Sequence, residues 1–440
     1  MMRSMFSGVS GLRAHQTRMD VIGNNVANVN TVGFKSGRVT FQEIFSQTLR
    51  GAGAPDSATG RGGTNPMQVG LGLGVGAVDT IMTRGSVQRT DNPTDLSIEG
   101  EGYFIVKGGA GDTFRFTRAG NFGVDKLGNL VSGSGMNVYG WQKYDRLSDG
   151  TYLFDTEQPI EPINLYSDIY NKNKRMIAAK ATTSAVFAGN LDASEPVAAV
   201  PATPTTNEIF SVPVTVYDSL GNPYKINVEL WKAAADATGS DWSWRVQAGT
   251  GYTVTAGATG TLEFDATGKL TAGAIPATAL RIAPIASKGT GPFDVQLDFT
   301  KITTYSADSS AKPTSVDGYS TGNLVTFNIG GDGILTGIYS NGQQQPLGLI
   351  ALASFENPAG LQKVGENLFI PTTNSGDFKK GLKAGSEGVG ALSPGTLEMS
   401  NVDLSREFTD MIVTQRGFQA NSRIITTSDE MLQELVNLKR

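Results

Sequence analysis

The chain has no cysteine and only one histidine among its 440 residues. Without cysteine it can form no disulfide, no thiolate nucleophile and no zinc site with cysteine ligands. The single His15 cannot supply several imidazole ligands to a metal within one subunit, and we interpret it as a polar position on the first helix. A protein without cysteine can work outside the cell without oxidative folding, although cytosolic proteins can lack cysteine too.

Charge and long apolar runs are also scarce. Charged residues make up 18% of the chain, and the net charge of −5 gives no electrostatic argument for nucleic acid or an anionic membrane as a partner. Arg3, Arg13, Arg18 and Asp20 interrupt the first helix, so we expect no signal peptide there. We therefore expect no membrane insertion, and an extracellular location would require export without a cleaved signal peptide.

The motifs of several enzyme classes are absent or incomplete. There is no P-loop, and the alternating glycines of 70–76 do not match the dinucleotide-binding fingerprint. No serine has a histidine partner for nucleophilic catalysis, because His15 belongs to a terminal helix. The Gly-rich turn at 330–333 lacks the remaining ligands of a calcium loop. We therefore predict no catalytic residue, no cofactor and no metal site.

What the sequence does contain is an amphipathic helix at each end. Apolar residues recur every seven positions in both, and a heptad repeat keeps them on one face that another helix must cover. Asp403 is a candidate N-cap for the last helix. We predict that the following residues make helix-packing or assembly contacts: Met5, Leu12, Met19, Ile22, Val26, Val29, Leu404, Phe408, Met411, Phe418, Ile425 and Leu432.

Between the helices the pattern is that of β-structure. Residues 103–106 form a continuous apolar run that suits a buried strand. In residues 210–216 apolar residues occupy every second position, as in a strand with one buried face and one face exposed to solvent. Pro213 places the second of these strands at a sheet edge. An Asp followed by Gly three residues later predicts tight turns at Asp125, Asp218 and Asp265.

The predicted fold is mainly β with a terminal α-helical coiled coil. Nested antiparallel β domains, sandwich-like or barrel-like, are inserted between the paired N- and C-terminal helices. The predicted parts are the coiled coil, a linker, an inner β domain and an outer β domain with or without a further subdomain. Their boundaries are, in that order, 1–30 with 400–440, 31–74, 75–165 with 342–399, and 166–341.

The end of the first helix is unusually rich in asparagine. Asn is a poor helix former, because its side chain competes for backbone hydrogen bonds. Such a segment is compatible with a simple helix end closed by a left-handed Gly33, or with side chains that bond to a neighbouring subunit. The residues of this motif are Asn24, Asn25, Asn28, Asn30, Gly33 and Phe34.

This segment resembles the signature of the rod and hook family of bacterial flagellar axial proteins. The opening residues 1–12 and the ending 400–438 are similar to that family too, as are three internal stretches in the expected order: 94–104, 117–122 and 140–141. Rod members are similar at the ends but lack most of 166–339. The length of the chain therefore favours the hook members.

The resemblance implies a structural subunit of the flagellar hook and not an enzyme. Subunits of this family form a helical homopolymer, a curved hollow tube that acts as a universal joint between motor and filament, and the linker 31–74 braces neighbours. The implied partners are a rod protein at the base, hook cap and hook–filament junction proteins at the tip, and the flagellar type III export apparatus. Some hook proteins crosslink through a cysteine, which this chain lacks.

Two alternatives remain open on the sequence. The first is a distal rod protein with an unusual insertion. The second is an extracellular adhesin or carbohydrate-binding module in which Trp231, Trp242, Trp244 and Tyr252 stack on sugars. Alternation favours a core position for Trp242 and Trp244, which argues against the second alternative.

Overall fold

The computed structural model describes residues 2–55, 60, 62–109, 112–147, 151–198 and 209–438. The chain forms two compact units. The first combines Met1–Lys172, Asn328–Thr336 and Pro346–Arg440, and the second contains Asn173–Phe327 and Gly337–Gln345. Both ends of the chain therefore belong to one unit, and the other is inserted into it.

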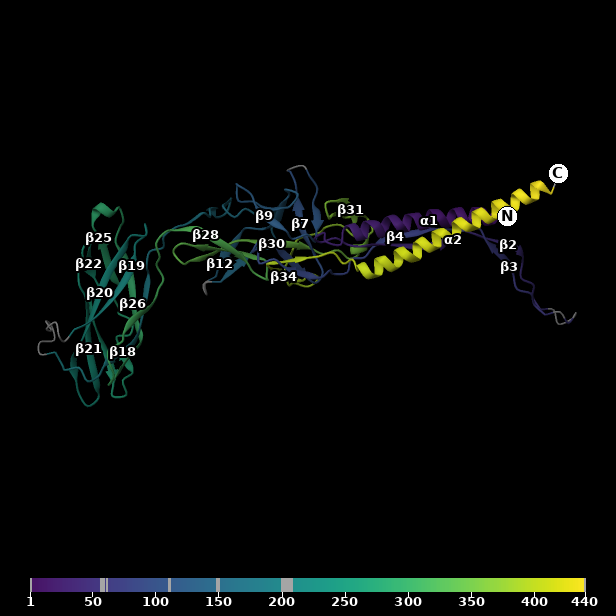
Figure 1. Cartoon of the computed structure of the whole chain (residues 1–440). Coiled ribbons are helices and arrows are strands. Elements are labelled where there is room, and N and C mark those ends of the chain that lie inside the picture. Colours follow the sequence, from purple (N-terminus) through teal and green to yellow (C-terminus); the bar gives the residue numbers. More distant parts are fainter. Residues whose placement is uncertain are drawn as a thin grey trace. The chain divides into compact units, whose positions relative to one another are not determined.

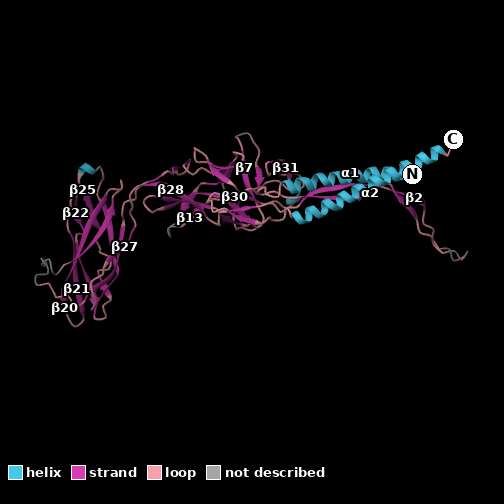
Figure 2. Cartoon of the chain, in the orientation of Figure 1, coloured by secondary structure: helices cyan, strands magenta, loops and turns pink. Residues whose placement is uncertain are grey.

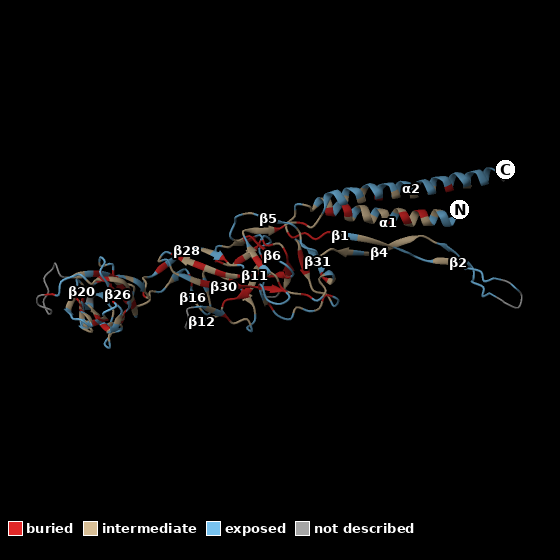
Figure 3. Ribbon diagram, turned by 90° about the horizontal axis from the view of Figure 1, so that it is seen from below, coloured by how far each residue is buried: buried red, intermediate tan, exposed pale blue. Residues whose placement is uncertain are grey.

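Two long helices stand at the chain ends, α1 (Met2–Ala27) and α2 (Leu404–Asn437), and they lie side by side (Figure 1). Asp403 caps α2 as predicted, because its carboxylate accepts the backbone N–H groups of Ser405 and Arg406. Most of their surface is exposed or half-buried, in contrast to the β core of the same unit (Figure 3). The helices therefore depend on few buried contacts within the chain.

The inner β domain is built on one sheet whose strands differ in length. β7 is its centre, and Phe104, Ile105 and Val106 are fully buried there, which confirms the predicted strand. The strands run in the order β30 (Gln344–Ala353), β11 (Asn137–Trp141), β7 (Tyr103–Lys107), β8 (Arg115–Thr117), β32 (Leu368–Ile370) and β31 (Gln362–Gly365). Attached to it are β9 (Phe122–Val124), β10 (Leu130–Ser132), β14 (Glu161–Pro162) and β33 (Leu382–Lys383).

Short strand pairs complete the first unit (Figure 2). Two of them join the beginning of the inner domain to the segment just before α2, so that this segment is fixed before the helix begins. They are β5 (Val87–Arg89) with β35 (Thr396–Glu398), and β6 (Leu96–Glu99) with β34 (Ala391–Pro394). The others are β12 (Tyr144–Arg146) with β13 (Tyr152–Phe154), and β15 (Ser167–Asp168) with β16 (Lys172–Asn173).

The predicted linker is an antiparallel β-ribbon. β1 (Gly37–Glu43) pairs with β4 (Leu73–Thr80), and β2 (Ser46–Arg50) pairs with β3 (Met67–Gly70). The ribbon formed by β1 and β4 contacts α1. Leu73, Val75 and Ala77 of β4 alternate with other residues, as in a strand, but two of the intervening residues are glycine, which strands normally disfavour.

The second unit contains a β-sandwich with a single apolar core between two five-stranded sheets. The first sheet runs β22 (Tyr252–Ala256), β25 (Leu280–Pro284), β26 (Phe293–Tyr305), β18 (Ser184–Asp192), β27 (Lys312–Val316). The second runs β19 (Phe210–Tyr217), β20 (Pro223–Ala235), β21 (Gly239–Val246), β23 (Thr259–Asp265), β24 (Leu270–Ala272). β17 (Met176–Ile177) of this unit pairs with β28 (Gly322–Ile329). β28 and β29 (Ile334–Tyr339) each lie partly in the first unit and partly in the second.

Several sequence predictions for this unit are confirmed. β19, which carries Pro213, lies at the edge of its sheet. Trp231, Trp242, Trp244 and Tyr252 are all buried, which leaves no exposed ring among these four to stack on a sugar. One pair differs from the antiparallel prediction: β18 and β26 are parallel. A parallel pair needs a long crossover, and the chain between these strands supplies it by forming the other sheet.

The predicted Asp turns also form. The carboxylates of Asp125, Asp218 and Asp265 each accept the backbone N–H groups two and four residues further along the chain. The glycine that follows three residues after each of them has a positive φ, so each turn uses the residue that its conformation favours.

Asp317 makes a more extensive set of bonds at the entrance of β18. Its Oδ1 accepts the backbone N–H groups of Thr183 at 2.8 Å and Ser184 at 2.9 Å. Its Oδ2 accepts the Thr183 hydroxyl at 2.6 Å and Lys180 Nζ at 3.0 Å. Burial alone would raise the pKa of Asp317, but these donors outweigh it and lower the pKa to about 2.

The substitution Asp317→Asn tests this contribution. A carboxyl whose pKa is lower in the folded state stabilises the protein above about pH 4, and that stability is lost as the pH falls toward 2. We expect Asp317→Asn to reduce the free energy of unfolding by about 1 kcal/mol at pH 7, after allowance for solvent screening, and by less at pH 2.5. Urea unfolding followed by tryptophan fluorescence measures both values. Asp294→Asn, at an exposed carboxylate of the same sandwich, is the control, and equal losses at both pH values would contradict the prediction.

Candidate assembly site

α1 and α2 pair in antiparallel orientation along a seam of small and polar residues. Ser4 lies opposite Ser428, with their hydroxyls 3.5 Å apart. A Cβ added at Gly11 would lie 2.8 Å from the Asn421 carboxamide, so the two backbones approach closely there. The seam thus recurs every seven residues on each helix, at Ser4, Gly11, Arg18 and Asn25 of α1 and at Glu407, Thr414, Asn421 and Ser428 of α2.

Polar bonds fix the register of this seam. Arg18 donates to the carboxylate of Asp410 at 2.9 Å, and Asn25 donates to Glu407 at 3.1 Å. In the described parts of the two helices, the buried apolar side chains are Ala14 and Ile22 of α1, at 3% and 4% exposure. Because polar pairs gain little net stability in place of water, this pairing is specific but weak.

Within the chain, the predicted apolar rows lie beside the seam. On α1 the row Met5, Leu12, Met19 and Val26 follows each seam residue by one position, and on α2 Met411 and Phe418 directly follow Asp410 and Gly417. Leu404, Phe408 and Phe418 are 38%, 50% and 42% exposed, while Ile425 and Leu432 are half-buried. Val29 lies beyond the end of α1 and is not a helical residue.

These rows form one apolar strip on the helix pair. Asp410 and Gly417 also contact α1, at Arg18 and His15. In an antiparallel pair related by a two-fold axis perpendicular to both helices, rows that follow such contact residues by one position lie on the same side of the pair. The β1–β4 ribbon contacts α1 through Ser10, His15 and Arg18 instead. We call this strip the apolar strip; it consists of Met5, Leu12, Met19, Val26, Leu404, Phe408, Met411, Phe418, Ile425 and Leu432.

The Asn-rich motif acts inside the chain. Asn25 is 1% exposed, and its carboxamide exchanges two hydrogen bonds with the backbone of Gly37, at 2.8 and 2.9 Å. Asn28 donates to the backbone and side chain of Asn24, while Asn30 is exposed. The motif therefore reverses the chain direction between α1 and β1. Asn25 in particular is buried and bonded within the chain, so its side chain is not presented to a neighbouring subunit.

Gly33 has the predicted positive φ, at +69°, but it stands in the segment after the helix and not at its cap. A Cβ there would lie 2.7 Å from the backbone nitrogen of Ala119, and its own N–H donates to the carbonyl of Glu398 at 2.8 Å. Phe34 beside it is buried, with Lys363 Nζ 4.8 Å from its ring centroid. The motif glycine thus allows this segment to pack directly on the inner domain.

A buried ionic cluster lies next to Gly33. Glu398 is fully buried, and it accepts Lys35 Nζ at 2.5 Å, the backbone N–H of Gly85 at 3.0 Å and Arg118 Nη1 at 3.3 Å. Burial alone would raise the pKa of Glu398, but the charges and hydrogen bonds of Lys35 and Arg118 lower it. Burial lowers the pKa of Lys35, and Glu398 opposes that shift. We call Lys35, Arg118 and Glu398 the ionic cluster.

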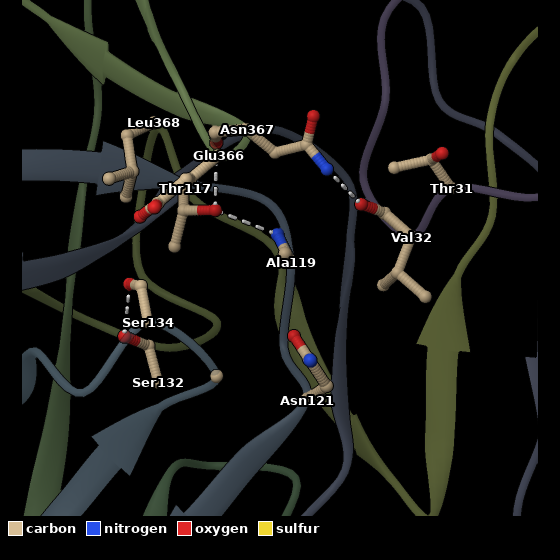
Figure 4. Close-up of a pocket in the computed structure, with 11 residues that line it drawn as sticks. Thr31, Val32, Thr117, Ala119, Asn121, Ser132, Ser134, Glu366, Asn367 and Leu368 are labelled. Carbon is tan, nitrogen blue, oxygen red and sulfur yellow. Dashed lines mark hydrogen bonds between the residues drawn. The ribbon is translucent and has the colours of Figure 1, made fainter. Parts of the chain in front are cut away.

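A polar cavity of about 460 Å³ opens beside the same segment (Figure 4). The turn of Glu366 and Asn367 forms one wall, and both residues have positive φ, at 51° and 56°. Asn367 holds this turn in place, because its amide donates to the carbonyl of Val32 and its carbonyl accepts the Thr117 hydroxyl. The lining combines hydroxyl and amide groups with the apolar residues Val32, Ala119 and Leu368.

The described residues were also searched for metal-binding groups and for membrane-spanning helices. In the ranges that the structure describes, no three His, Asp or Glu residues are grouped so that they could hold a metal ion. None of the described helices combines the length and the apolar character that a membrane crossing requires.

Sequence reasoning missed both the glycine seam and the ionic cluster. The seam repeats with the same heptad spacing as the apolar rows, but at small, polar and charged residues, which apolar periodicity does not register. Lys35 and Arg118 fall inside stretches that resemble the family, yet nothing in the sequence indicates that Glu398, hundreds of residues away, lies between them.

The ionic cluster yields a stability prediction. Glu398→Gln leaves Lys35 and Arg118 buried without a carboxylate, and we expect it to reduce the free energy of unfolding by about 3 kcal/mol. Urea unfolding of the full chain, followed by circular dichroism, measures the loss. The control is Asp79→Asn, which removes an exposed partner of Arg38 and should cost less than about 0.5 kcal/mol. Similar losses for both variants would contradict the prediction.

Comparisons with protein families and with known proteins found matches along the chain. Four family models match successive parts of the chain: "Flagella basal body rod protein" at 5–35, "Flagellar hook protein FlgE/F/G D1 domain" at 97–170, "Flagellar basal body protein FlaE D2 domain" at 190–319, and "Flagellar basal body rod FlgEFG protein C-terminal" at 393–438.

Whole proteins are similar over their full length. The flagellar hook protein FlgE of Borreliella burgdorferi is 42% identical and that of Treponema pallidum 40% identical, each over 100% of both chains. The flagellar basal-body rod protein FlgG of Bacillus subtilis is 32% identical over 100% of both chains. The crystal structure of the Helicobacter pylori flagellar hook protein FlgE2 matches 71% of this chain and 100% of its own, with a TM-score of 0.50 and 14% identity, which concerns the fold alone.

Proposed function

The chain belongs to the flagellar hook protein family, and we propose that it is a structural subunit of the hook that assembles through the apolar strip of its helix pair. The main support for this contact surface is the exposure of its apolar side chains. The strip presents Leu404, Phe408 and Phe418 to solvent, although the heptad spacing of these residues is typical of side chains that pack against other helices. A head-to-tail contact that does not close into a ring builds a helical tube.

The β-ribbon supports a second contact. Ile44, Phe45, Leu49 and Met67 of its outer half are all more than half exposed. Such residues are costly to leave in water and gain stability when another copy covers them. We infer that this ribbon braces neighbouring subunits, as the resemblance of the linker 31–74 implies.

Finer features of the proposal follow from the family. The polymer is a curved hollow tube that transmits motor torque to the filament as a universal joint. Its partners are a rod protein at the base, hook cap and junction proteins at the tip, and the type III export apparatus. The subunit is exported to the cell exterior without a cleaved signal peptide, and in this role it is not an enzyme.

The alternative that the chain is a rod protein is supported by one relative, which is named a rod protein. The expectation that rod members lack most of 166–339 is not met by this relative, which aligns over the whole of both chains, so length does not separate the two alternatives. Against the rod alternative stand the higher identities to proteins named as hook proteins. We therefore favour the hook.

Deletion of the gene separates the two alternatives. Without a hook subunit, cells should retain basal-body rods but lack hooks and filaments, because a rod is the base on which hooks are built. Electron microscopy of basal bodies isolated from the mutant measures this outcome. Absence of the rod as well would assign the protein to the rod class, and intact flagella would contradict both assignments.

A substitution on the apolar strip tests the contact surface. Phe418→Asp should leave the monomer folded, because Phe418 is 42% exposed there, but it should abolish tube formation by placing a charge in a buried contact. Circular dichroism checks the monomer, and electron microscopy after salt-induced polymerisation checks assembly. Gln419→Asp adds the same charge at the next residue, which points away from the strip. Normal tubes from Phe418→Asp, or equal loss with Gln419→Asp, would contradict the assignment.

A further inference from the structure

His15 is the single histidine of the chain and it lies inside the helix seam. Its ring packs on the backbone of α2 at Gly417, where an added Cβ would lie 2.7 Å from the ring atoms Cε1 and Nε2. Phe41 of β1 closes another side of the ring, edge to face, with the ring centroids 5.6 Å apart. The imidazole is therefore held between α1, α2 and the ribbon.

This site accommodates the neutral ring. The Nδ1 atom is buried and has no hydrogen-bond partner among the residues that the structure describes. Arg18, one turn further along α1, places its guanidinium 5.8 Å from the centroid of the same Phe41 ring. Burial first, and then the positive charge of Arg18, lower the pKa of His15 below its ordinary value.

The acids on the surrounding elements already have partners. Asp410 and Glu407 of α2 bond to other side chains of α1. On the ribbon, Asp79 and Glu43 bond to side chains of the ribbon itself. A proton added at Nδ1 of His15 therefore creates a second cation near Arg18, without a carboxylate to accept it.

We propose that His15 is a pH sensor for the pairing of the terminal helices: its neutral ring permits α1 and α2 to pair, and its protonation in mildly acidic medium separates them. The sign follows from linkage. A histidine that is harder to protonate in the folded chain stabilises that chain above about pH 6.5, and this stability is lost as the pH falls below that value. Because the chain has no second histidine, no other imidazole titrates in the pH range of this loss of stability.

The consequence for assembly rests on the proposed function. The apolar strip combines rows from both helices, so it exists only while they are paired. Loss of pairing below about pH 6.5 would remove the contact surface and leave the subunit monomeric. The effect on the helix pair itself does not depend on what the protein assembles into.

A residue swap tests the proposal on the full chain. The double variant His15→Gln/Gln16→His keeps the composition but moves the histidine to the neighbouring exposed position. Nuclear magnetic resonance of ¹³C-labelled histidine gives the titration midpoint, and amide hydrogen exchange in α1 reports on pairing at pH 7.5 and 5.5. We expect the native midpoint to lie below about 6.5 and native exchange to quicken at least several-fold at pH 5.5, beyond its intrinsic pH dependence. The swap should titrate near 6.5 and show no such change.

All titratable groups other than the histidine are the same in the native chain and in the double variant. Burial raises the pKa of Glu407, so its titration has the opposite sign, and it is identical in the native and swapped chains. A native midpoint at or above 6.5, or equal loss of protection in both proteins, would overturn the proposal. Neither result would affect the hook assignment, which the gene deletion tests separately.

Discussion

The ionic cluster is the constraint on which the first unit depends. Lys35 follows α1, Glu398 precedes α2, and Arg118 belongs to the inner β domain. Each charge is buried, and none is tolerable without the others, because an isolated ion in a low-dielectric interior costs several kcal/mol. The cluster therefore forms only when both ends of the chain and the domain between them are in place. It couples the folding of the two termini in a protein whose ends are far apart in sequence.

The terminal helices divide their surface between two tasks. The seam uses glycine and small polar residues, so the backbones approach closely but gain little from the hydrophobic effect. The larger apolar side chains lie beside the seam, where the chain itself covers them only in part. A more apolar seam would make a tighter pair but would consume residues that another copy needs. Under the assembly surface that we propose, the polar intrachain pairing leaves this apolar area free for another copy.

The sequence was sufficient to predict much of the fold, because helices, buried strands and Asp turns are encoded locally. The heptads, the strand at 103–106 and the turn at Asp125 all carry their signal within a few residues. The seam was hidden because Gly11 and Gly417 pack through the absence of a side chain, which periodicity of apolar residues does not register. The ionic cluster was hidden because it joins residues distant in sequence. The ribbon was missed because its alternating apolar residues, such as Leu73 and Val75, are separated by glycines, which are depleted in strands.

The position of the cluster also bears on how a hook subunit carries load. Force applied to either helix reaches the inner domain through a short segment, from Ala27 to Lys35 on one side and from Glu398 to Leu404 on the other. Both segments end on the same carboxylate, so neither helix can be pulled away without exposing a buried charge. The seam beyond it is weak and can rearrange at low cost. A subunit built in this way is stiff where helices meet the β domain and adaptable along the helices, which is what a tube that bends while transmitting torque requires.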